Sequence, residues 1–280
     1  MPAPAPAQAV HLHLIAYSEA TRAALEPGYA MLDNLANPRP DWYEYWPMRQ
    51  FLARQALDEA AFYGFFSPKF ASKTGLTHAQ TVATVQAAAA NAKADVVLFS
   101  PQPDMAAFFL NVFEQNELFD PGFLAASEAF FKHIGQPCQL GALVMDMRQT
   151  VFSNYFVARP AFWREWLALG ERLFAICEGT DALATPALRQ QLTHSTSYPG
   201  AVQRKVFLVE RLAPWLLTQQ PKWRTHAANP FNMAWSASRL RERPMDAVIS
   251  DALKMAYREN GFPQYLTAFA QMRQSLPGAT

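Results

Sequence analysis

Polar and aromatic side chains that can bind a ligand concentrate in the segment from Asp33 to Phe70. An ordinary packed helix or strand has no reason to combine so many Asn, Arg, Trp, Tyr and Pro residues. Amide and guanidinium groups bind hydroxyls and phosphates, and aromatic rings stack on a base or a sugar. We therefore predict that this segment binds the ligand. Its candidate contacts are Asp33, Asn34, Arg49, Tyr63 and Lys69.

Further polar residues are candidates in the expected strands, turns and helices outside this segment. They are Tyr17, Ser100, Asp104, Asn111, Asp146, Asn154, Tyr155, Lys205 and Glu210. Asp146 ends an expected strand, where open α/β sheets place their ligand crevice. Ser153, Asn154 and Tyr155 follow it closely and can recognise hydroxyl groups.

The composition excludes several classes of protein. With 24 basic and 23 acidic residues the net charge is only +1, so no clustered basic face for nucleic acid is indicated. Cys138 and Cys177 stand alone, which is typical of buried thiols in a reducing compartment. The start of the chain lacks the pattern of a signal peptide, and no apolar run is long enough to span a bilayer. We expect a cytoplasmic protein with a disordered Pro/Ala-rich lead over residues 1–9.

Hydrophobic periodicity and capping residues predict alternating strands and helices. Ser18 is expected to cap a short helix, Thr77 and Gln80 form a capping box, and residues 29–40 are expected to be a loop. The patterns predict strands over 11–18, 61–66, 95–101, 142–147 and 151–158, and helices over 41–56, 77–90, 104–115, 121–134, 160–177, 183–193, 203–219, 245–259 and 262–275.

This order of elements predicts an α/β fold with a helical C-terminal region. We expect residues 10–280 to form one domain, whose helical part covers about 183–280. The chain contains no internal repeat and no linker long enough to force a domain boundary.

Most familiar catalytic motifs are missing from the sequence. It contains no G-x-G-x-x-G, no Walker A, no G-x-S-x-G and no H-E-x-x-H. His11 and His13 share one face of a predicted strand, but no third metal ligand is evident beside them. We therefore assign no metal ligands from the sequence.

Several short segments together resemble a known family. They are the DN…N loop at 33–37, the Glu-containing aromatic stretch Tyr43–Trp46, the YGFFSPKF strand and turn, DVVLFSP, SNYFVARPAFW and KVFLVERL. In this series the chain is similar to bacterial capsule and lipopolysaccharide glycosyltransferase-like proteins. The resemblance covers about residues 10–215. The chain departs from it in having Lys69 as the only cation of the turn after the glycine-containing strand, and in lacking an acidic metal-binding pair.

The resemblance implies a GT-A-type, Rossmann-like mixed sheet flanked by helices. It also implies a nucleotide-sugar donor and a glycan or lipid-linked acceptor of surface-polysaccharide assembly. Mn²⁺ or Mg²⁺ is the cofactor that such enzymes would use. Association with the membrane surface and the oligomeric state are left open.

Sugar transfer from a nucleotide requires two kinds of residue. The leaving diphosphate must be neutralised by a metal or by cations, for which Arg49, Lys69 and Lys205 are candidates. In an inverting reaction a carboxylate must deprotonate the acceptor hydroxyl. The candidates for this base are Asp146, Asp104 and Glu210.

Two other interpretations remain open. A non-catalytic interaction or scaffold protein of the same pathway would keep the fold without a metal site, and the missing D-x-D favours it. A different nucleotide-dependent enzyme, such as a methyltransferase or a nucleotidyltransferase, is disfavoured by the absence of a Gly-rich loop.

Overall fold

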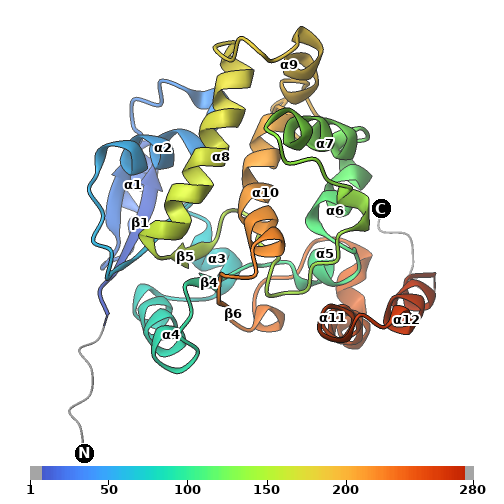
Figure 1. Ribbon diagram of the computed structural model, residues 1–280. Helices are drawn as coiled ribbons and strands as arrows, with labels where there is room; N and C mark the ends of the chain where they lie inside the picture. Colours follow the sequence, from blue (N-terminus) through green and yellow to red (C-terminus); the bar gives the residue numbers. More distant parts are fainter. Residues whose placement is uncertain (1–7, 275–280) are drawn as a thin grey trace, which may run out of the picture.

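A six-stranded mixed sheet runs through the centre of the protein. The computed structural model describes residues 8–274 (Figure 1). The strands are β1 (Val10–Ala16), β2 (Ala30–Asp33), β3 (Phe62–Phe66), β4 (Val96–Leu98), β5 (Phe156–Ala158) and β6 (Thr225–Ala227). Their order is β2-β1-β3-β5-β4-β6, and β5 is antiparallel to both of its neighbours while the other pairs are parallel. The carboxyl ends of the five parallel strands therefore share one edge of the sheet.

Helices cover both faces of this sheet. They are α1 (Glu19–Ala23), α2 (Tyr45–Arg54), α3 (Phe70–Thr74), α4 (His78–Asn91), α5 (Pro103–Ala107), α6 (Val112–Phe119), α7 (Phe123–His133), α8 (Pro160–Glu178), α9 (Pro186–Leu192), α10 (Arg204–Gln219), α11 (Pro244–Asn260) and α12 (Pro263–Gln274). Short 3-10 turns lie at Pro40–Trp42, Leu140–Ala142, Pro230–Asn232 and Arg239–Glu242. In Figure 1, α8 and α10 lie beside each other over one face, while α11 and α12 pack together far from β1.

The alternation of side chains along the strands builds two hydrophobic cores. In β3, Phe62 and Phe66 face the smaller core with α3 and α4, whereas Tyr63 and Phe65 face the larger core under α2, α8 and α10. Trp163 anchors α8 to the larger side. Its ring stacks on Phe156 at 4.4 Å, and its Nε1 donates to the carbonyl of Tyr63 at 2.9 Å.

Most predicted elements are confirmed. The α/β class, the flanking helices and the helix-rich C-terminal part are present. The capping box at Thr77 and the N-cap at Ser18 both form, and Pro160 occupies the first turn of α8. Of the lead expected over 1–9, residues 8 and 9 belong to the described part. The carbonyl of Ala9 accepts from the amide of Phe62, and residues 1–7 lie outside the described part.

Several local predictions are wrong. The strand expected over 142–147 is irregular, and the strand expected over 151–158 is reduced to β5. β2 lies within the expected loop 29–40, and β6 lies in the part expected to be helical. The helix expected over 104–115 is divided into α5 and α6, because the Asn111 side chain accepts from two amides and starts a new helix there.

Within residues 8–274, no helix combines the length and apolarity needed to cross a bilayer.

The packing of α2 on α8 depends on a glycine. A Cβ at Gly170 would lie 2.6 Å from the Tyr45 ring, which is almost fully buried. Gly170→Ala is therefore expected to lower the free energy of unfolding by about 1–2 kcal/mol, because overpacking outweighs the better helix propensity of Ala. Urea denaturation measures this. Gly141→Ala, where a Cβ meets no atom within 4 Å, is the matched control. Equal stability of Gly170→Ala and the wild type would contradict this account of the packing.

Candidate functional site

A large cleft opens at the carboxyl ends of the parallel strands. Its volume is about 1060 Å³. Residues that follow four of these strands line it, namely Tyr17 after β1, Asn34 after β2, Ser67 after β3 and Gln102 after β4. In open α/β sheets, ligands bind at this edge. The cleft is therefore the candidate site.

Two lysines and three carboxylates line this cleft, and one of these carboxylates, Asp120, is buried in an ion pair with Arg204 at 2.7 Å. Glu44 precedes α2, Lys69 precedes α3, Lys73 lies within α3, and Glu210 lies on α10. Lys73 Nζ donates to Ser153 Oγ at 2.9 Å. Glu210 forms an ion pair of 2.8 Å with Arg211. Among the described residues, neither Glu44 nor Lys69 has an ion-pair partner within 4 Å, so both charges are available to a ligand.

The acidity of Glu44 is unusual. Burial raises the pKa of Glu44 to about 7, and the nearby charge of Glu210 adds to the rise. The charge of Lys73, a hydrogen bond with Ser67 and the charge of Lys69 oppose it in part. A carboxylate whose pKa lies near neutral pH can accept a proton from a hydroxyl and release it again.

The segment that carries Glu44 is held by charged contacts outside the cleft. Asp41 accepts from Arg39 at 3.0 Å and from Lys205 at 2.6 Å. Arg39 and the indole of Trp42 both donate to Glu178 on α8, at 2.6 and 2.9 Å. These bonds fix the turn before α2, so Glu44 has little freedom to move away from the cleft.

Strained backbone also gathers at this site. Seven described residues other than Gly have positive φ, and five of them line the cleft. These five are Asn37, Tyr43, Gln102, Ser153 and Asn154. Backbone in this region costs about 1–3 kcal/mol per residue and occurs preferentially at functional sites.

The structure brings five of the predicted site residues together. Tyr17, Asn34, Lys69, Asn154 and Glu210 all line the cleft. Tyr155 lies directly behind them, where its hydroxyl is hydrogen-bonded to Ser67 Oγ at 2.6 Å. Asp33, at the end of β2, is exposed and accepts from the amide of Leu35.

Other predicted residues lie outside the lining and have structural partners. Arg49 forms a bidentate pair with Glu171, and Lys205 is buried against Asp41. Asn111 caps α6 and donates to the carbonyls of Leu140 and Leu143. Tyr63 accepts from the amide of Asp58, and Ser100 accepts from the amide of Phe152.

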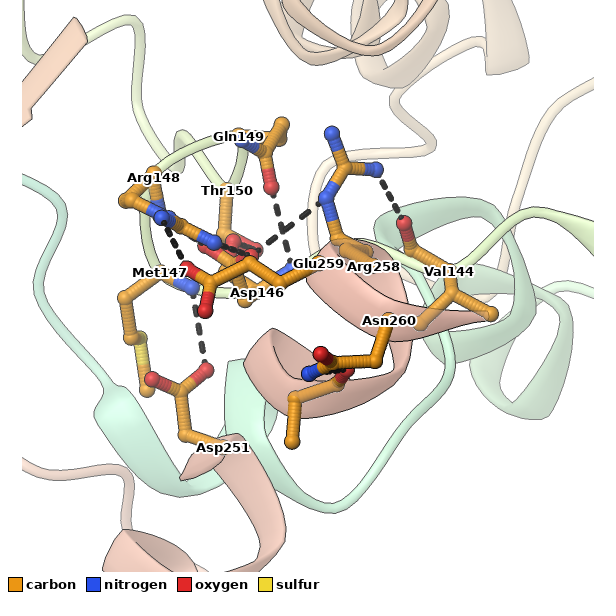
Figure 2. Close-up of polar contacts among 11 residues, drawn as sticks. Val144, Asp146, Met147, Arg148, Gln149, Thr150, Asp251, Arg258, Glu259 and Asn260 are labelled. Atoms are coloured by element: carbon orange, nitrogen blue, oxygen red, sulfur yellow. Dashed lines mark hydrogen bonds and ion pairs between the residues drawn. The ribbon is translucent and has the colours of Figure 1, made fainter. Parts of the chain in front are cut away.

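Two of the three predicted base candidates are engaged in buried contacts. Asp104 accepts from the amide and the hydroxyl of Ser236, which ties the 236–238 segment to α5. Asp146, which does not end a strand, is fully buried between Arg148 at 2.8 Å and Arg258 at 3.4 Å (Figure 2). Neither carboxylate is among the residues that line the cleft.

Residues of α11 complete the network around Asp146. Asp251 accepts from the amide of Met147 at 3.0 Å, and Glu259 pairs with Arg148 at 3.0 Å (Figure 2). Burial raises the pKa of Asp251 to about 6 and lowers that of the neighbouring Lys254 to about 8. This network fastens α11 to the loop before β5.

No metal site emerges among the described residues. Within 8–274, no group of three or more His, Cys, Asp and Glu side chains is placed to hold an ion. His13 is buried, its Nδ1 lies 3.4 Å from the carbonyl of Gly64, and burial lowers its pKa to about 4. Both cysteines are free thiols.

Sequence reasoning missed Glu44, Lys73 and Ser67 as candidates, whereas Ser153, which it did propose for hydroxyl recognition, lines the cleft. The signal for Glu44 was its position as the only acidic residue between Trp42 and Trp46. Aromatic neighbours keep water away from a carboxylate, and this desolvation favours a raised pKa.

Comparison with protein-family models, with curated proteins and with solved structures found no match.

The raised pKa of Glu44 predicts a pH-dependent stability difference. The folded state binds this proton more tightly than the unfolded state, so the wild type loses stability as the pH rises from about 4.5 to about 7. Glu44→Gln carries no such charge. It is therefore expected to be more stable than the wild type by about 1–3 kcal/mol at pH 8, with no gain at pH 4.

Urea denaturation at several pH values measures this difference. Glu242→Gln, on an exposed turn, controls for the loss of one negative charge. A pH-independent difference between Glu44→Gln and the wild type would show that Glu44 does not titrate near neutral pH.

Proposed function

We propose that this protein is a glycosyltransferase of GT-A type that moves a sugar from a nucleotide-activated donor to a glycan or lipid-linked acceptor. The observation that carries the proposal is the position of Glu44. Its high-pKa carboxylate faces a cleft at the carboxyl ends of the strands, beside two lysines. The resemblance to capsule and lipopolysaccharide transferases supports the same reaction, in the cytoplasm.

The size of the cleft suits two substrates. Ligand pockets commonly measure about 300–1,000 Å³, and this one reaches about 1060 Å³. Tyr17, Asn34 and Asn37 offer an aromatic ring and amides at the ends of β1 and β2 for the nucleoside. Lys69 and Lys73 then lie at the β3 end, where the diphosphate would follow.

The proposed reaction is a displacement at the anomeric carbon. The oxygen of an acceptor hydroxyl forms a bond to this carbon while the bond to the donor diphosphate breaks. Glu44 takes the hydroxyl proton, and Lys69 and Lys73 stabilise the negative charge that develops on the leaving diphosphate. A base with a pKa near 7 is ionised often enough at neutral pH to accept this proton.

The lysines should determine donor affinity. Lys69→Ala and Lys73→Ala are each expected to weaken binding about 10- to 100-fold, because each removes a charge-assisted phosphate contact worth about 1.5–3 kcal/mol. A thermal-shift screen with UDP-, GDP- and dTDP-sugars identifies the donor, and calorimetry then measures the affinities. Lys132→Ala, an exposed lysine on α7, is the matched control.

The same titrations in EDTA and in Mn²⁺ show whether the lysines act alone. We expect less than a tenfold gain with Mn²⁺, since a larger gain, above about 1.4 kcal/mol, would reveal a metal-dependent site. Unchanged affinity in both lysine variants would refute the placement of the diphosphate. A chain that binds no nucleotide sugar would favour the interaction-protein alternative.

Glu44 should determine turnover. Glu44→Gln is expected to lower kcat by about a hundredfold or more while leaving donor affinity nearly unchanged, because it removes the base but keeps the shape. In the wild type, kcat is expected to fall below pH 7. Glu210→Gln should move this fall to lower pH, because the charge of Glu210 raises the pKa of Glu44.

The Asp146→Asn variant tests whether Asp146, rather than Glu44, is the base. It disturbs a buried pair with two arginines and is expected to reduce stability rather than kcat. Normal turnover in Glu44→Gln, together with a large loss in folded Asp146→Asn, would assign the base to Asp146 instead.

A further inference from the structure

Aromatic side chains are exposed around the mouth of the cleft. Tyr17, Tyr43, Phe119 and Tyr198 line it, and each exposes between 43% and 58% of its surface. Exposed aromatic rings that gather around a concave site are typical of a binding surface. Three of these residues, Tyr43, Phe119 and Tyr198, are linked by the hairpin over residues 195–203.

This short hairpin presents Tyr198 at the mouth of the cleft. Ser195 and Gln203 form a β-bridge, and the amide of Ala201 donates to the carbonyl of Tyr198 at 3.1 Å. Pro199 and Gly200, with φ of 87° at Gly200, occupy the two central positions of this turn. Pro followed by a residue of positive φ is the pattern of a type II turn, so the sequence itself fixes the hairpin tip.

The hairpin contacts the other two aromatic residues. Ser197 Oγ donates to the carbonyl of Phe119 at 3.2 Å. A Cβ at Gly200 would lie 3.8 Å from the hydroxyl of Tyr43. The Tyr198 ring packs edge-on against Phe207 of α10, with a centroid distance of 5.6 Å. The rings of Tyr43, Phe119 and Tyr198 therefore belong to one rim, which we call the aromatic rim.

Buried polar groups line the same cleft near this rim. The side chain of Arg211 is 4% exposed, and its Nη2 donates to the side-chain oxygens of Gln115 and Asn116 at 3.2 and 3.1 Å. Arg211 Nε and Asn116 Nδ2 have no hydrogen-bond partner within the described residues. Buried donors without partners are rare in native proteins, and a bound ligand is one explanation for them in residues that line a cleft.

We propose that the aromatic rim and these donors form a carbohydrate subsite that takes a pyranose ring of the acceptor. A pyranose presents C–H groups on its faces and hydroxyls around its edge. The faces match exposed aromatic rings, and the hydroxyl oxygens match the donors of Asn116 and Arg211. The assignment of this subsite to the acceptor rests on the proposed function, whereas the binding of carbohydrate at the subsite does not depend on that function.

A glycan array of pyranosidic oligosaccharides, probed with the labelled full-length chain, tests this subsite. The wild type is expected to bind at least one member of the array. Tyr198→Ala and Phe119→Ala are each expected to weaken that binding about tenfold, since each removes one stacking face. Tyr198→Phe should retain binding because it keeps the ring. Leu183→Ala, which changes a side chain that is 85% exposed outside the cleft, should also retain it.

Two results overturn the subsite. One is the absence of any bound glycan on the array, and the other is equal glycan binding by the wild type, Tyr198→Ala and Phe119→Ala.

Calorimetry with the nucleotide sugar identified in the donor screen distinguishes a failure of this subsite from a failure of the proposed function. If glycan binds through the rim and no nucleotide sugar binds, the subsite stands and the transferase proposal fails. If the donor binds and no glycan does, the subsite fails alone.

Discussion

The antiparallel insertion of β5 between β3 and β4 is the constraint on which the site depends. A strand that runs against parallel neighbours begins where they end. The residues just before Phe156 must therefore lie at the carboxyl edge of the sheet, inside the cleft. Ser153 and Asn154 make this approach through two consecutive left-handed conformations, with φ of 58° and 53°. β5 is only three residues long. All three residues are fully buried between two neighbouring strands, and this burial stabilises the short strand.

The second constraint is the anchoring of the turn before α2. Arg39, Asp41, Glu178 and Lys205 form a connected set of half-buried ion pairs between this turn, α8 and α10. Exposed pairs contribute little to stability, but a network that shares partners orders several side chains together. The indole of Trp42 joins it through Glu178. Lys205, which the sequence suggested as a phosphate ligand, thus helps to position Glu44 instead.

The sequence predicts the fold class and most helices, because periodicity and caps are local signals. Ser18, Thr77 and Pro160 start their helices as their chemistry requires. β2 and β6 were missed because strands of three or four residues carry no periodicity of their own and depend on pairing with β1 and β4. The sequence predicted only part of the site, because some of its residues come together only through contacts between distant parts of the chain. Strand ends indicated Tyr17 and Lys69, and the polar segment 33–70 indicated Asn34, but only the three-dimensional packing brings Glu210 of α10 near Glu44.

Asp146 and Glu44 show why a carboxylate in a sequence does not reveal its role. Asp146 is fully buried, yet Arg148 and Arg258 lie within 4 Å and compensate its charge. Asp146 also lies outside the lining of the cleft. Glu44 has no cation within 4 Å among the described residues, and the charge of Glu210 acts on it against the charges of Lys73 and Lys69. Leaving a carboxylate in this state costs stability, which selection for folding alone would remove. The cost is understandable if the proton affinity of Glu44 is itself the useful property.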